Sequence, residues 1–201
     1  MKFKIKMICI CLLVSTGFTS KLKAQVFEEG KTNFAVGYGF GTFYGAVLSD
    51  YQDESNYEST VTGPIYLKFE SALSDKIGLG INLAYAKYSL SYNYTDFSSS
   101  NIYTETDSYT TFSILARMNV HFGDFDRFDP YWGVGVGYRS GKFDYKSTDP
   151  DGYNSFDVNV NFPFGFETTL GARYYFSDNI GMYLETGLAK SVLQVGLTFS
   201  M

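Results

Sequence analysis

The chain alternates large apolar side chains with small or polar ones at every second position, and it does so eight times between Gly30 and Met201. A period of two residues is the one at which a β-strand turns successive side chains to opposite faces. The segment 180–189 displays the pattern, with Ile180, Met182, Leu184 and Leu188 on one face and Gly181, Tyr183, Glu185, Gly187 and Ala189 on the other. The pattern therefore predicts eight strands, each with one apolar face.

The composition of the two faces indicates which of them meets lipid. A water-soluble barrel would place its bulky apolar side chains inside and a polar face with few glycines in water. Here the more polar face is itself made largely of small residues, which fit the narrow interior of an eight-stranded barrel, while the apolar face suits hydrocarbon. The sequence predicts an all-β fold: an eight-stranded antiparallel up-and-down transmembrane β-barrel with its apolar face toward lipid.

The expected strands cover residues 33–44, 60–72, 77 onward, 103–122, 130–144, 156–176, 180–189 and the segment that follows Lys190 and Ser191. The third strand changes parity near Lys87, which predicts either a β-bulge or a strand that leaves the membrane and continues as an extracellular hairpin. The first, third and fifth connections are long and polar, whereas the second, fourth and sixth are short. Long loops are therefore expected outside the cell and short turns in the periplasm.

The first 24 residues have the pattern of a cleavable signal peptide. Three lysines, Lys2, Lys4 and Lys6, precede an apolar stretch from 7 to 18, and the small residue Ala24 comes before Gln25. We expect a signal peptide at 1–24 and one outer-membrane β-barrel domain at 25–201. The two cysteines of the chain, Cys9 and Cys11, both fall in the signal, so no thiol chemistry is expected in the mature protein.

Charge excludes one class of partner. The signal carries five lysines and no acidic residue, so its removal changes the net charge from −5 to −10. Nucleic-acid binding depends on neutralising phosphates with basic side chains. We therefore expect no nucleic-acid partner.

The inward parity of the predicted strands carries charges of both signs: Lys68, Glu70, Arg117, Arg139, Glu167, Arg173 and Glu185. Isolated charges away from water are costly, so these groups are expected to pair, with Glu167 and Glu185 neutralising Arg139 or neighbouring cations. Paired groups would form a structural plug, because an eight-stranded lumen is just wide enough for its own side chains. The alternative is a gated or selective small pore.

His121, the only histidine, is expected near the periplasmic end of the fourth strand and facing the lumen. A catalytic histidine would need a carboxylate and a serine at the same end, and the sequence offers no convincing set. We expect a structural role for His121, no catalytic residues and no cofactor. Asp129 precedes a proline and is expected in a turn.

Acidic residues concentrate in the predicted outer loops: Asp50, Asp53, Glu54 and Glu58; Asp96, Glu105 and Asp107; Asp144, Asp149, Asp151 and Asp157. Carboxylates are the ligands of hard divalent cations, and such ions would bridge these loops to anionic surface lipid. Solvated loops explain the same residues without a ligand. We expect solvated loops and no metal site.

Three segments carry a resemblance: 130–138 (PYWGVGVGY), 171–176 (GARYYF) and 195–201 (VGLTFSM). With these segments the chain resembles small outer-membrane β-barrel proteins related to the barrel of outer membrane protein A and to opacity-type surface porins. The resemblance implies a place in the outer membrane, contact with outer-membrane lipids and lipopolysaccharide, and insertion by the barrel assembly machinery. No peptidoglycan-binding domain is expected after the barrel.

The expected function is a non-enzymatic structural or surface-interaction role in the cell envelope, with the loops as the contact surface. The alternative is a narrow channel for small solutes or ions. The sequence does not identify an extracellular partner.

Overall fold

The computed structural model describes residues 26–42, 57–95, 101–123, 125–150, 155–160 and 164–201. These residues form nine antiparallel strands in one sheet: β1 (Thr32–Phe40), β2 (Tyr57–Ser74), β3 (Ile77–Thr95), β4 (Ile102–His121), β5 (Phe128–Ser147), β6 (Phe156–Val160), β7 (Gly165–Tyr175), β8 (Ile180–Leu188) and β9 (Leu193–Ser200). They include no helix long and apolar enough to cross a membrane. The expected signal peptide at 1–24 lies outside the described residues.

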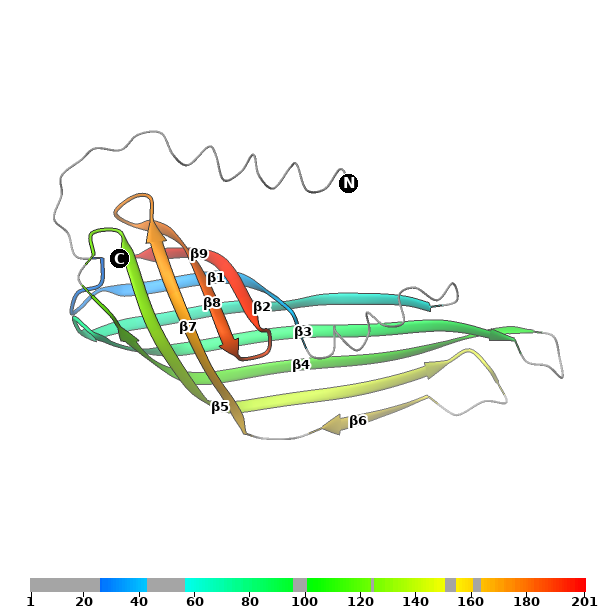
Figure 1. The fold of residues 1–201 in the computed structure, drawn as a ribbon. Coiled ribbons are helices and arrows are strands. Elements are labelled where there is room, and N and C mark those ends of the chain that lie inside the picture. Colours follow the sequence, from blue (N-terminus) through cyan, green and yellow to red (C-terminus); the bar gives the residue numbers. More distant parts are fainter. Residues whose placement is uncertain (1–25, 43–56, 96–100, 124, 151–154, 161–163) are drawn as a thin grey trace, which may run out of the picture.

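The sheet closes on itself. β1 pairs with β2 on one side and with β9 on the other, and the pairing of β4 with β5 completes the ring. Eight strands, β1 to β5 and β7 to β9, form the wall, and β6 pairs only with β5 above it (Figure 1). The predicted eight-stranded antiparallel barrel is confirmed.

The two faces of the wall have the predicted chemistry. On β8, Leu184 points outward and is 52 % exposed, whereas its neighbours Tyr183 and Glu185 point inward and are each 1 % exposed. Large apolar side chains from all eight wall strands are exposed in the same way. A continuous apolar surface of this size belongs in hydrocarbon, because soluble proteins rarely expose such patches.

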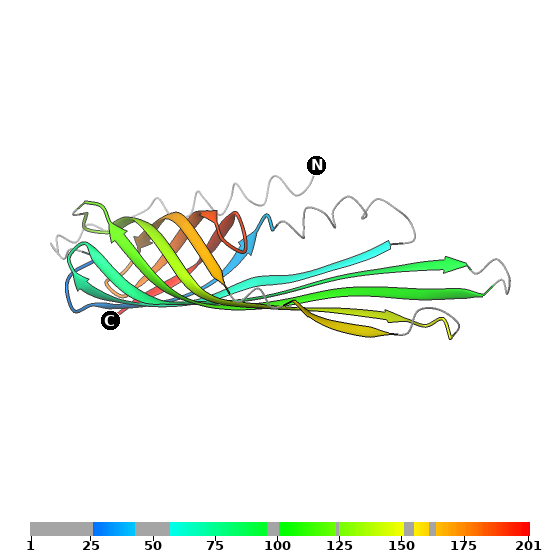
Figure 2. The ribbon, with the colours of Figure 1, turned by 90° about the horizontal axis from the view of Figure 1, so that it is seen from below.

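Four of the strands are far longer than a bilayer requires. β1, β8 and β9 have 9, 9 and 8 residues, close to the roughly 9–11 that a tilted strand needs to span a membrane. β2, β3, β4 and β5 have 18, 19, 20 and 20 residues. Their excess length continues, together with β6, as a sheet that projects from the barrel at the end opposite the C-terminus (Figure 2). We call this part, residues 57–62, 87–95, 102–111, 141–147 and 156–160, the extended sheet.

The side chains of β3 keep one parity along its whole length, so the change expected near Lys87 is a change in residue type on the inward face. β3 pairs with β4 without interruption from Ile77 to Thr95, so β3 contains no bulge. The register shift lies in β2, between Thr62 and Ile65. Of the two alternatives, the bulge in the third strand is wrong, and continuation of that strand beyond the barrel is what the structure has. Bulky side chains can occupy the inward parity there because no lumen confines them.

Other boundaries differ from the predicted ones. The expected sixth strand, 156–176, is two strands, β6 and β7, and 161–163 lie outside the described residues. β1 ends at Phe40 rather than at residue 44, which is also outside the described part. β2 and β5 begin earlier than expected, at Tyr57 and Phe128. Their cross-strand pairing already includes residues that the sequence placed in the preceding loop or turn.

Candidate functional site

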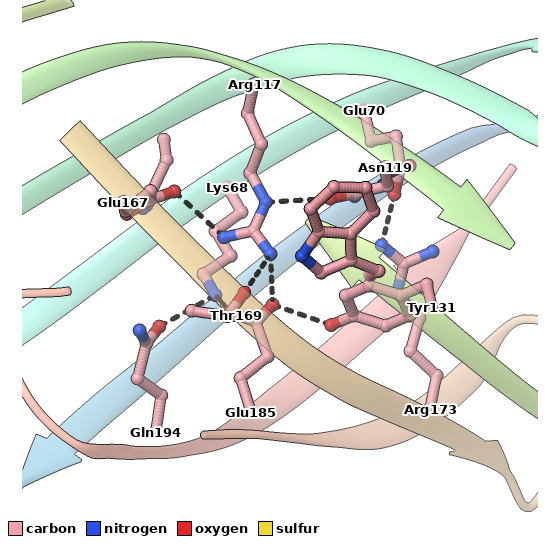
Figure 3. A network of polar contacts seen from close by, with 12 residues as sticks. Lys68, Glu70, Arg117, Asn119, Tyr131, Glu167, Thr169, Arg173, Glu185 and Gln194 are labelled. Carbon is pink, nitrogen blue, oxygen red and sulfur yellow. Dashed lines mark hydrogen bonds and ion pairs between the residues drawn. The ribbon is translucent and has the colours of Figure 1, made fainter. Parts of the chain in front are cut away.

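Charged and polar side chains fill the interior of the barrel, and Glu185 on β8 is the centre of one group (Figure 3). Its Oε2 lies 2.7 Å from Lys68 Nζ, and its Oε1 lies 3.0 Å from Arg117 Nη2. The Tyr131 hydroxyl donates to Oε1 at 2.6 Å, and the Thr169 hydroxyl donates to Oε2 at 3.1 Å. Four donors from four other strands thus meet one carboxylate.

Arg117 on β4 extends this group toward β7. Its Nη1 lies 2.9 Å from Glu167 Oε1, and its Nε donates to Asn119 Oδ1 at 2.8 Å. The Asn82 amide donates to both oxygens of Glu167, at 2.9 and 2.8 Å. Lys68, Arg117, Glu167 and Glu185 form what we call the upper cluster, in which two cations balance two carboxylates.

A lower cluster, Glu70, His121, Asp129 and Arg173, lies nearer the C-terminal end of the barrel. Arg173 bridges the two carboxylates, bonding Glu70 through Nη2 and Asp129 through Nη1, the latter at 3.2 Å. His121 bridges them again, with Nε2 at 2.9 Å from Glu70 and Nδ1 at 2.6 Å from Asp129. Both ring nitrogens face carboxylate oxygens, so each contact needs one proton between nitrogen and oxygen. With the positive charge of Arg173, the lower cluster is then also balanced.

Three further side chains tie the clusters together and cover the lower one. Asn119 accepts from Arg117 and donates to Glu70 at 2.8 Å. The ring of Tyr131 lies 4.6 Å from the Arg173 guanidinium carbon, while its hydroxyl binds the upper cluster. Phe27, buried just before β1, stacks on the His121 ring with centroids 3.5 Å apart. The network is therefore continuous along the lumen.

Little room remains between these groups. The space lined by both clusters has a volume of about 20 Å³, enough for roughly one water molecule. Glycines on the inward face make the close packing possible: a Cβ at Gly171 would lie 2.7 Å from Glu185 Cγ, and one at Gly133 would collide with the Arg117 guanidinium. The geometry is that of a filled lumen.

Comparison with known proteins agrees with this architecture. Residues 23–191 match the family model described as outer membrane protein beta-barrel domain. The chain belongs to this family. It is an outer-membrane β-barrel protein, and its apolar wall faces the lipids of that membrane.

Solved structures similar to this outer-membrane barrel have low sequence identity to it. They include Ail, the attachment invasion locus protein of Yersinia pestis (13 % identity, covering 86 % of this chain and 99 % of Ail, TM-score 0.45). The N-terminal β-barrel domain of Pseudomonas aeruginosa OprF matches at 14 % identity (87 % and 98 % covered, TM-score 0.37). The outer membrane protein OprG of Pseudomonas aeruginosa matches at 13 % (88 % and 98 %, TM-score 0.38). No curated protein sequence matched.

Six of the seven inward charges expected from the sequence lie in the two clusters, and Arg139 does not. It is half-buried on β5 and makes no ion pair within the described residues. Of the two alternatives for Glu167 and Glu185, neutralisation of Arg139 is wrong, and pairing with neighbouring cations, Arg117 and Lys68, is what the structure has. Glu167 pairs across the sheet with Gly135, four residues below Arg139, so its carboxylate meets Arg117 instead.

Asp129 is a lumen residue that the sequence pattern did not predict. An aspartate before proline suggested a turn, but β5 begins at Phe128, and Asp129 shares the inward parity of Tyr131. The carboxylate partners that seemed absent for His121 are therefore present, as Glu70 and Asp129. The inward polar residues Asn82, Thr169 and Gln194 complete the network, and their parity was the signal that could have identified them.

The acidic residues expected in outer loops are placed differently. Five of them lie on paired strands of the extended sheet: Glu58, Glu105, Asp107, Asp144 and Asp157. Asp149 follows β5, and Asp50, Asp53, Glu54, Asp96 and Asp151 lie outside the described residues. In the part of the chain that the structure describes, no three or more histidine, cysteine or acidic side chains gather as a metal site would require.

Proposed function

We propose that this outer-membrane barrel is a non-enzymatic surface-interaction protein, in which the barrel is a closed anchor and the extended sheet is the contact surface outside the cell. The observation that carries the proposal is the unequal length of the strands. Three wall strands stop at the membrane thickness, and four continue by about as many residues again as paired sheet. Ordered sheet beyond the bilayer contributes nothing to spanning it, so a role in contact with other molecules explains its presence.

The filled lumen supports the anchor role. Both clusters are charge-balanced and buried, and opening a path through them would separate ion pairs in a medium of low dielectric constant. The proposed role of Lys68, Glu70, Arg117, Glu167, Arg173 and Glu185, together with His121 and Asp129, is to fix the strand register and seal the barrel. Arg139 lies apart from this seal.

The proposal also includes the maturation of the chain. Residues 1–24 are cleaved as a signal peptide, the domain at 25–201 is inserted by the barrel assembly machinery, and the outer leaflet around it contains lipopolysaccharide. A mature protein that begins at Gln25 would have Phe27, which covers the lower cluster, as its third residue. Mass spectrometry of the protein from outer-membrane fractions tests this start directly.

Conductance separates the proposal from its alternative, a narrow channel. Purified protein in a planar bilayer should give no steady current, because the space between the two clusters has room for roughly one water. Steady, ion-selective steps would favour the channel and refute the sealed anchor.

Whole cells test the contact surface. Residues 90–107, the distal hairpin of β3 and β4, can be replaced by a two-residue turn because Ser89 and Ser108 are paired partners. Cells that produce the shortened protein at equal outer-membrane level should be retained less on protein-coated and cell-coated surfaces than cells with the full chain. Equal retention would refute a contact role for the extended sheet.

A further inference from the structure

The strand register gives the extended sheet two unlike faces. The face continuous with the lumen carries aromatic and aliphatic side chains from all five strands: Tyr57 and Val61; Tyr88, Leu90, Tyr92 and Tyr94; Tyr103 and Tyr109; Phe143 and Tyr145; Phe156 and Val158. We call it the aromatic face. Its rings lie in contact across strands, with centroids 5.2 Å apart for Tyr57 and Tyr92 and 5.3 Å apart for Tyr145 and Phe156.

The opposite face is built from hydroxyl and amide side chains, and we call it the hydroxyl face. Cross-strand hydrogen bonds join Ser89 with Ser108 at 2.9 Å, and the Thr104 hydroxyl donates to Asn93 at 2.7 Å. Its charges are equal in number: Glu58, Asp144 and Asp157 against Lys87, Lys142 and Lys146. They also pair, since Lys142 Nζ lies 2.8 Å from Asp144 and 3.1 Å from Asp157. The acidic and basic side chains of the hydroxyl face therefore balance one another.

The aromatic face carries negative charges that no cation of the extended sheet balances. Glu105 and Asp107 lie on it, two residues apart on the middle strand β4. All the lysines of the extended sheet, which has no arginine, lie on the hydroxyl face, so within the described residues neither carboxylate has an ion-pair partner. Tyr92 donates its hydroxyl to Glu105, and burial together with the nearby Glu105 raises the pKa of Asp107. Two negative charges thus stand uncompensated in the centre of an aromatic platform.

We propose that the aromatic face binds an arginine-rich segment of an extracellular protein. The guanidinium group is the one protein cation that stacks flat on aromatic rings and also binds a carboxylate through two parallel hydrogen bonds. Tyrosine surrounds the acidic pair on both neighbouring strands, at Tyr92 on β3 and Tyr145 on β5. Tyrosine is rigid and amphipathic, which lowers the entropy cost of forming a contact surface. The inference rests on the proposed function and names the partner chemistry of its contact surface.

The test measures binding of fluorescein-labelled hexa-arginine to the full protein in nanodiscs of zwitterionic lipid, by fluorescence anisotropy. Replacing the central acids together, Glu105→Gln with Asp107→Asn, should weaken binding by about tenfold or more, as expected for loss of charge-assisted hydrogen bonds. The matched control is Glu58→Gln with Asp157→Asn, which makes the same change in net charge on the hydroxyl face and should leave affinity within about twofold. Tyr92→Leu should weaken binding by about threefold through loss of stacking.

Heat-shifted gel mobility confirms that each variant is folded before binding is measured. Hexa-lysine, with the same charge but no planar group, should bind several-fold more weakly than hexa-arginine. Equal losses in the two double variants, or equal affinity for the two peptides, would reduce the effect to net charge and overturn the inference. Absence of hexa-arginine binding to a protein that still supports cell retention would overturn the arginine-rich partner alone and leave the contact role intact.

Discussion

Replacing Glu185 by glutamine tests the lumen network at its most connected point. The substitution keeps the shape of the side chain and removes its charge. Arg117 retains Glu167 at 2.9 Å, but Lys68 loses its carboxylate partner and keeps the Gln194 carbonyl oxygen at 2.8 Å and the Tyr183 ring, whose centroid is 4.5 Å away. Removing one partner of a buried ion pair costs about 3–5 kcal/mol. Because one of the two cations remains paired, we expect about 3 kcal/mol.

A second substitution separates loss of the pair from loss of packing. Lys68→Met fills the same space without charge, so Glu185→Gln in that background leaves no orphaned ammonium group. A buried ion pair replaced by uncharged groups of similar volume is often close to neutral in stability. The double variant should therefore be more stable than Glu185→Gln alone, by about 2 kcal/mol. Double-mutant cycles show such coupling when two residues are in contact.

The assay is urea unfolding in lipid vesicles, followed by the fluorescence of Trp132. This is the only tryptophan in the chain, and it lies on the outward face of β5, so its emission reports transfer from lipid to water. Glu58→Gln, on the exposed hydroxyl face, is the control for loss of a negative charge and should change stability by less than about 0.5 kcal/mol. If Glu185→Gln unfolded within about 0.5 kcal/mol of the unmodified protein, or if the two substitutions were simply additive, the account of the plug would be refuted.

Two further substitutions test the faces of the wall and the exclusion of Arg139. Leu184→Arg puts a charge on the lipid side of β8 and should lower the free energy of unfolding by about 2–4 kcal/mol in the same urea assay. Its control, Ser89→Arg on the extended sheet, should cost less than about 1 kcal/mol. Equal costs would mean that the faces are misassigned. Arg139→Gln should change stability by less than about 1 kcal/mol, because this arginine makes no ion pair within the described residues; a loss comparable to that of Glu185→Gln would place Arg139 in the network after all.

The local pattern of residues predicted the strands of the barrel wall, but it did not predict how far four of them continue beyond the membrane. Period-two alternation and glycine on one parity identified strands such as β8 and assigned both of its faces, because these features depend only on neighbours in sequence. The extended sheet alternates in the same way, but neither hydrocarbon nor a lumen borders its faces. Residues 87–95 therefore show an apparent change of parity, because the strand has left the hydrocarbon there and its inward parity no longer faces a lumen.

The partners across the lumen were less predictable, because they depend on barrel geometry rather than on strand pattern. Glu70 and Arg173 are 103 residues apart and lie on β2 and β7, which do not pair with each other. Their contact follows from the tilt and stagger with which eight strands close. The parity of Glu70 and Arg173 predicts that both side chains face inward, but it does not predict that they contact each other. For the same reason parity left open whether Arg139 or a neighbouring cation neutralises Glu167, and the structure has Arg117 there.

One relation within the wall could have located the network from sequence, and it changes the meaning of the inward glycines. Taken from the sequence alone, they indicate a narrow lumen lined by small residues. In the structure three of the four residues of the upper cluster pair directly with a glycine on a neighbouring strand: Arg117 with Gly80 and Gly135, Glu167 with Gly135, and Glu185 with Gly171. A Cβ at Gly135 would lie 2.8 Å from Glu167 Cγ and one at Gly171 would lie 2.7 Å from Glu185 Cγ, so each of these glycines leaves room for the carboxylate side chain of its partner. Short turns fix antiparallel register, so the pairing of Glu185 with Gly171 follows from the four-residue turn between β7 and β8. Lys68, paired with Ala35 and Asn82, and Arg173, paired with Asp129 and Tyr183, lie in the clusters without such a glycine, so the relation identifies some members of the network but not all. Inward glycines opposite inward charges therefore indicate a lumen that is filled, and a sequence with such pairs predicts a plug rather than a pore.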